Sequence, residues 1–75
     1  MAVKINTNDD GVTTITPSGD AEYCNFFVTA SKEGVSVELA YVDSTEGARE
    51  MLEALTLALE IYASYASEQQ SHDAE

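Results

Sequence analysis

A chain of 75 residues with a net charge of −11 forms one domain at most, and an isolated domain of this size is marginally stable. Its 14 acidic residues against three basic ones repel phosphate backbones and anionic lipids, so we expect no direct binding to nucleic acid or membranes. One cysteine permits no internal disulfide, and without a recognisable secretory signal or membrane span we expect a cytoplasmic protein.

The first predicted unit is a β-hairpin. Segment 2–6 alternates apolar and polar residues, and segment 12–16 is rich in β-branched residues, so both are expected as strands. The residues at 8–11, Asn-Asp-Asp-Gly, tolerate the left-handed backbone of a tight turn. Val12 and Ile15 would point to opposite faces of a regular strand, which makes the second strand the weakest element.

A second hairpin follows the break at 17–20. Segment 22–31 alternates regularly, and its two faces are Cys24, Phe26, Val28 and Ala30 against Tyr23, Asn25, Phe27 and Thr29. Gly34 supplies the positive φ of a tight turn, and segment 35–42 returns with Val35, Val37, Leu39 and Tyr41 on one face. Tyr23 and Phe27 are a predicted aromatic contact with a partner, and ordinary cross-strand packing is the alternative.

A long helix ends the predicted fold. It runs from Thr45 to about Ala66, contains no proline, and has Ser44 as its N-cap. The fold class is therefore α+β: a two-layer arrangement of an antiparallel sheet of three to four strands followed by one long C-terminal helix, in the order β-β-β-β-α. Residues 1–66 form the single domain, and the polar segment 67–75 is expected to be a disordered acidic tail.

The helix carries more apolar surface than one small sheet can cover. At about 100° per residue, the arc expected to face the sheet is Ala48, Met51, Leu52, Leu55, Leu59, Tyr62, Ala63 and Ala66. A second stripe remains: Ala54, Leu57, Ala58, Ile61 and Tyr65. We expect a second copy of the chain to cover this stripe in a homodimer, with cover by the same chain or by a heterologous target as the alternatives.

No set of residues in the sequence supports an enzyme. Segment 6–11 has oxygen ligands at calcium-loop spacing, but Pro17 stands where such a loop places its bidentate glutamate. Cys24 alternates in phase with Phe26 and Val28, and His72 lies in the polar tail, so a thiol–imidazole pair is not expected. We therefore expect a non-enzymatic protein with no metal and no cofactor.

The acidic charge predicts a basic protein as partner. The expected function is a non-enzymatic protein–protein interaction module, in its sharpest form an inhibitor that mimics nucleic-acid charge to block a basic nucleic-acid-binding protein. The acidic residues expected to contact the partner are Glu22, Glu33, Glu38, Asp43, Glu50, Glu53 and Glu60. The alternative is a small structural or assembly subunit whose acidity serves solubility only.

Overall fold

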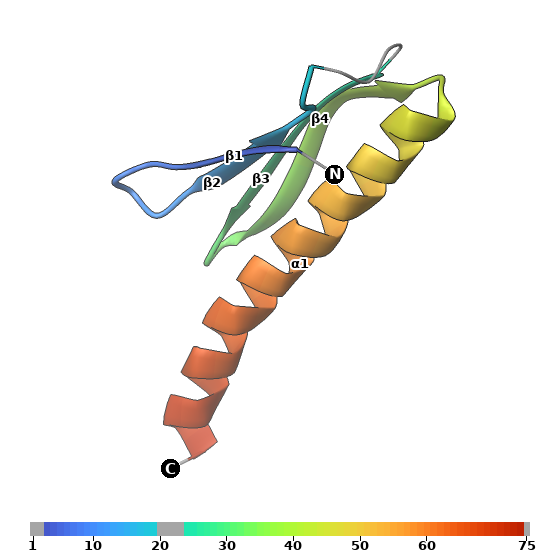
Figure 1. The fold of residues 1–75 in the computed structure, drawn as a ribbon. Coiled ribbons are helices and arrows are strands. Elements are labelled where there is room, and N and C mark those ends of the chain that lie inside the picture. The colour runs from blue at the N-terminus through green and yellow to red at the C-terminus, as the bar shows by residue number, and fades with distance from the viewer. Residues whose placement is uncertain (1–2, 20–23, 75) are drawn as a thin grey trace.

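The computed structural model describes residues 3–19 and 24–74, without the side chains of 39, 40 and 68–74. A four-stranded sheet carries one long helix across one of its faces (Figure 1). The elements are β1 (Lys4–Thr7), β2 (Thr13–Thr16), β3 (Cys24–Ser31), β4 (Gly34–Val42) and α1 (Thr45–Ala74). The predicted α+β fold class and the order β-β-β-β-α are confirmed.

The sheet is an antiparallel meander in which each strand pairs with the next along the chain. The hairpins are fixed by hydrogen bonds and by glycine backbone angles in their turns. The side-chain oxygen of Asn8 accepts hydrogen bonds from the backbone N–H groups of Asp10 and Val12, at 2.9 and 3.1 Å. Gly11 in this turn has a φ of 84°, and Gly34 at the β3–β4 turn has a φ of 142°. Both turns therefore rest on the residue types that predicted them.

The core lies between the sheet and α1. Its fully buried apolar residues are Ile15, Phe26, Val28, Ala30, Ala54 and Ala58. Phe26, Val28 and Ala30 alternate along β3, so the predicted inner face of this strand is confirmed. Phe27 lies between two of them in the chain and points to the opposite face, where its side chain is 40% exposed.

β4 changes face partway along its length because of a β-bulge. Phe27 pairs with Glu38 whereas Asn25 pairs with Tyr41, so two steps along β3 match three steps along β4. Val37 therefore lies on the face toward α1, while Tyr41 lies with Asn25 on the outer face. The prediction that Tyr41 shares a face with Val37 is wrong, because the bulge inserts one residue between them.

The face of α1 that packs on the sheet is only partly the predicted one, because Met51 and Leu55 of the predicted arc pack against the core but other members do not. Ala54 and Ala58 are 0% exposed, whereas Leu52 and Leu59 are 66% and 56% exposed. Ala54 and Ala58 are thus covered within the chain, and their assignment to a homodimer surface is wrong. The physical reason is size, since methyl groups let the helix approach closely enough to enclose the ring of Phe26, which is 1% exposed.

The start of α1 is fixed by a cap and by a close contact with β3. Ser44 Oγ accepts a hydrogen bond from the N–H of Gly47 at 3.0 Å, which confirms Ser44 as the N-cap. The thiol of Cys24 lies 3.8 Å from the Gly47 carbonyl oxygen and donates to it. A Cβ added at Gly47 would lie 2.7 Å from the Cβ of Cys24, so only glycine fits without a shift.

α1 continues to Ala74, past the predicted end near Ala66. The segment after Ala66 contains no glycine or proline, so nothing in its sequence stops a helix. The C-terminal part of α1 extends beyond the sheet (Figure 1), and the division into a domain at 1–66 and a tail at 67–75 stays a prediction. The helical residues that the structure describes include no stretch long and apolar enough to cross a bilayer.

Candidate functional site

Two apolar stripes, offset by one residue, run along α1. The covered stripe faces the sheet and consists of Gly47, Met51, Ala54, Ala58, Ile61 and Tyr65. The exposed stripe consists of Ala48, Leu52, Leu55, Leu59, Tyr62 and Ala66. Each repeats at alternating intervals of four and three residues, which puts its members on one side of a helix. One sheet covers the first stripe and leaves the second open.

The residues predicted for self-association lie on or beside the covered stripe. Ala54 and Ala58 are in the core, Leu57 and Ile61 pack against it, and the Tyr65 hydroxyl donates to the Gly11 carbonyl across 3.5 Å. Ala54 and Ala58 are therefore fully covered within the chain, and Leu57, Ile61 and Tyr65 are partly covered. The apolar surface left over on α1 belongs to the arc that sequence analysis had directed at the sheet, of which Met51 and Leu55 pack against the core.

The exposed stripe presents large apolar side chains to solvent. Leu52 and Leu59 are more than half exposed, and Tyr62 is 38% exposed. Leu55 is half-buried beside them and also packs against the core. Contiguous exposed apolar side chains on one side of a helix are typical of a protein–protein interface.

An acidic row, defined as Glu46, Glu53 and Glu60, follows another side of α1. Its members recur every seven residues, about 10 Å apart along the helix axis. Glu46 and Glu60 are exposed, whereas Glu53 is half-buried. The Oε1 atom of Glu53 is buried and has no hydrogen-bond partner in the described part of the chain.

A shallow depression of about 520 Å³ lies beside the acidic row. It is lined by Arg49, Leu52, Glu53, Thr56, Leu57 and Glu60. Two carboxylates and two leucines in one depression suit a long basic side chain, whose stem contacts apolar groups while its charged end meets an acid.

The other acidic residues predicted to contact a partner are dispersed. Glu33 lies in the β3–β4 turn, Glu38 is on the outer face of β4, and Asp43 precedes α1. Glu22 lies outside the described residues. Of the predicted set, Glu53 and Glu60 line one depression, and Glu46 continues their seven-residue spacing along α1, which could have identified it.

Glu50 is engaged within the fold. Its carboxylate accepts hydrogen bonds from the backbone N–H and the hydroxyl of Ser18, at 3.0 and 2.7 Å. The backbone hydrogen bond from Ser18 holds the pKa of Glu50 below its usual value, with the hydroxyl adding to the effect and burial opposing it. Glu50 thus ties the segment after β2 to α1, which makes it a structural residue rather than a free contact for a partner.

The outer face of the sheet carries two exposed aromatic side chains. Phe27 is 40% exposed and Tyr41 is 59% exposed, and the register places both on the side away from α1. Tyr23, predicted to accompany Phe27, lies outside the described residues. Tyr41 was missed because the bulge that turns it outward depends on strand pairing.

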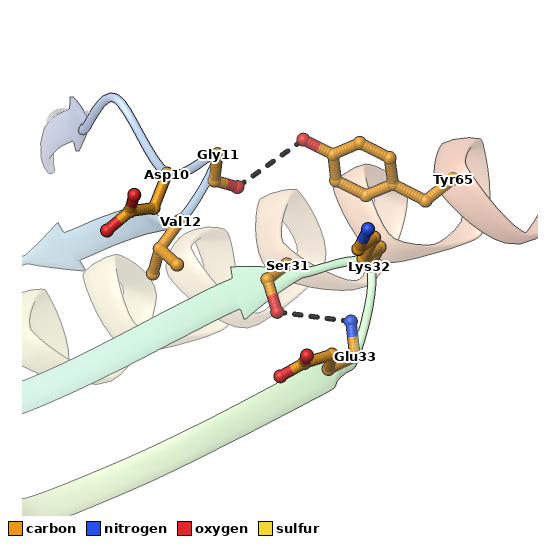
Figure 2. A pocket seen from close by; sticks show the side chains of 7 residues that line it. All are labelled: Asp10, Gly11, Val12, Ser31, Lys32, Glu33 and Tyr65. Carbon is orange, nitrogen blue, oxygen red and sulfur yellow. Dashed lines mark hydrogen bonds between the residues drawn. The ribbon is translucent and has the colours of Figure 1, made fainter.

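Figure 2 shows a cleft of about 350 Å³ where the two hairpin turns meet α1. Its walls are Asp10, Gly11, Val12, Ser31, Lys32, Glu33 and Tyr65. Among the described residues, no group of three acidic, histidine or cysteine side chains is arranged to hold a metal ion. The cleft is small, and its charged side chains, Asp10, Lys32 and Glu33, are of mixed sign.

Cys24 lies partly buried beneath the first turn of α1. Burial raises the pKa of its thiol, and the nearby charge of Glu50 adds to this effect. A thiol held in its protonated form is a poor nucleophile, so the setting of Cys24 suits packing rather than catalysis.

Comparison with protein-family models finds no matching family, and neither curated proteins nor solved structures give a significant match. The functional interpretation therefore rests on the charge and geometry of the surfaces of α1.

Proposed function

We propose that this chain is a non-enzymatic protein–protein interaction module that binds a basic cytoplasmic partner through the acidic row of α1. The observation that carries this function is the depression beside the acidic row, where the side chains of Glu53 and Glu60 lie with Leu52 and Leu57. An arginine or lysine from a partner that enters this depression would supply a hydrogen-bond donor and the opposite charge. Leu52 and Leu57 offer apolar contact for the stem of that side chain.

In its sharpest form the module is an inhibitor that mimics nucleic-acid charge. A nucleic-acid-binding protein presents lysines and arginines that neutralise regularly spaced phosphates. The acidic row offers carboxylates at regular intervals on a rigid helix, within a chain of net charge −11. These features support competition with nucleic acid for the same basic surface.

The test is affinity capture with the wild-type chain, followed by competition with duplex DNA. The retained proteins are expected to be basic, to be released by salt, and to be displaced by DNA. The double variant Glu53→Gln/Glu60→Gln loses two carboxylates, each of which contributes about 1 kcal/mol to the free energy of binding. Its affinity for the partner should therefore fall about 30-fold. Asp9→Asn/Asp10→Asn removes the same charge from the exposed β1–β2 turn and serves as the matched control.

Two results would contradict this function. Retention that is insensitive to salt would show that charge does not drive binding. An equal loss of binding in the Asp9→Asn/Asp10→Asn control would show that net charge, rather than the acidic row, matters.

A second candidate function is a small assembly subunit whose acidity only confers solubility. The exposed stripe favours it, because three large apolar side chains on α1 are uncovered in a single chain. This function predicts self-assembly in the absence of any basic protein.

A further inference from the structure

The exposed stripe of α1 has the pattern of a helix–helix contact. Its members follow intervals of four, three, four, three and four residues, which is the spacing of the apolar positions in a coiled coil. The sheet already covers the neighbouring stripe, so α1 is built to pack on both sides. Its three large, solvent-facing side chains form a continuous apolar surface of the kind that a partner covers.

We propose that a second copy of this chain occupies the exposed stripe, with the two α1 helices antiparallel. The stripe has a small residue at each end, Ala48 and Ala66, and four large residues between them. The order of sizes is therefore the same from either end. In an antiparallel pair centred between Leu55 and Leu59, Leu55 of each copy faces Leu59 of the other, and Leu52 faces Tyr62. Ala48 faces Ala66 at both ends. A two-fold interface needs such self-complementarity.

The exposed stripe itself carries no charge, which suits an apolar helix such as its own copy. None of its six members is charged, and the next residues around one side of the helix are Arg49, Thr56 and Ala63. The acidic row borders the stripe at the depression, where Leu52 lies with Glu53 and Glu60. Two chains of charge −11 repel each other, so a contact made through uncharged side chains keeps that repulsion lowest.

The size of the stripe sets the strength of the dimer. Residues 48–66 span about 27 Å of helix, and a helix about 10 Å wide gives a footprint of roughly 300 Å². Two such footprints bury roughly 600 Å² in total, below the roughly 1,200 Å² at which stable specific interfaces begin, so the dimer is weak and reversible. We expect a dissociation constant between about 10 µM and about 500 µM. The dimer does not require the proposed basic partner, although Leu52 belongs both to the exposed stripe and to the depression.

The first test is the solution mass of the purified chain as a function of concentration, by sedimentation equilibrium. The wild-type mass should rise from monomer to dimer. Leu59→Glu should remain monomeric, because its carboxylate would face Leu55 of the other copy. The matched control is Ile5→Glu, which adds the same charge at a side chain that is 55% exposed on β1 and should dimerise like wild type.

Three results would overturn the dimer. One is a monomeric wild-type mass at about 1 mM, above the expected dissociation constant. Another is equal dimerisation of wild type and Leu59→Glu, with circular dichroism showing that both are folded. Loss of the dimer in Ile5→Glu as well as in Leu59→Glu would attribute the effect to net charge.

The second test fixes the orientation by disulfide trapping in a Cys24→Ser background. Ala48→Cys and Ala66→Cys chains, distinguished by a mass tag, are mixed and oxidised. The antiparallel pair brings position 48 of one copy close to position 66 of the other, so the mixed disulfide should dominate. Predominant 48–48 and 66–66 disulfides would show parallel packing and overturn the antiparallel dimer.

Discussion

Gly47 is a position where α1 lies close to β3, and Gly47→Ala tests that approach. The added Cβ would lie 2.7 Å from Cys24 Cβ, 2.9 Å from Ser44 Oγ and 3.2 Å from Cys24 Sγ. Overpacking of this kind costs about 1–3 kcal/mol, and disturbing the Ser44 cap costs about 1 kcal/mol more. Alanine in place of glycine within a helix raises the unfolding free energy by about 1 kcal/mol, which offsets part of this cost. The expected net loss of unfolding free energy is therefore about 1–3 kcal/mol.

The assay is urea unfolding followed by circular dichroism at low protein concentration, so that self-association does not contribute. In thermal unfolding, the melting temperature should fall by about 4–8 °C for each kcal/mol of unfolding free energy that is lost. Cys24→Gly removes both clashing atoms of residue 24, so Gly47→Ala should cost less in that background than in wild type. At an open helical site, alanine would make the variant more stable than wild type. If Gly47→Ala is more stable than wild type, the close contact between α1 and β3 is refuted.

Three further predictions concern the cap, the Ser18–Glu50 contact and the face of α1. Ser44→Ala should lower the unfolding free energy by about 1 kcal/mol in the same urea assay, and no change would contradict the cap. The pKa of Glu50 is lower in the folded state than in the unfolded state. The ionised carboxylate therefore stabilises the fold fully above the unfolded-state pKa of about 4.3, and this contribution is lost as pH falls through the folded-state pKa. Melting temperature against pH should therefore fall less steeply on the acid side in Glu50→Gln, and identical profiles would count against the contact. Ala58→Leu should destabilise by about 1–3 kcal/mol while Leu59→Ala changes stability by less than about 0.5 kcal/mol, and the reverse order would contradict the assigned face.

The order of elements could be predicted because each boundary has a local chemical cause. Asn8 and Gly11 close the first turn through their own backbone and side-chain groups. Gly34 at the second turn and Ser44 at the start of α1 also act through their immediate neighbours. Such features depend on a few neighbouring residues, so a single sequence is sufficient to identify them.

The face of α1 could not be predicted because both stripes have the same spacing. The arc assigned to the sheet by its angular position contained Leu52 and Leu59, yet the helix residues fully covered by the sheet are Ala54 and Ala58. That selection depends on how close the helix lies to Phe26, which is a property of the packed layers and not of the helix alone. The outward position of Tyr41 depends likewise on a bulge that exists only once β3 and β4 pair.

The central claim is that α1 uses one stripe to fold and the other to meet a second chain. The most direct measurement is a dilution series by methyl and amide NMR, from about 1 mM to about 10 µM, across the expected dissociation constant. The signals of Leu52, Leu55, Leu59 and Tyr62 should shift with concentration, while those of Ala54 and Ala58 stay fixed. Shifts confined to Phe27 and Tyr41 on the outer sheet face, or no shifts at all, would contradict the claim.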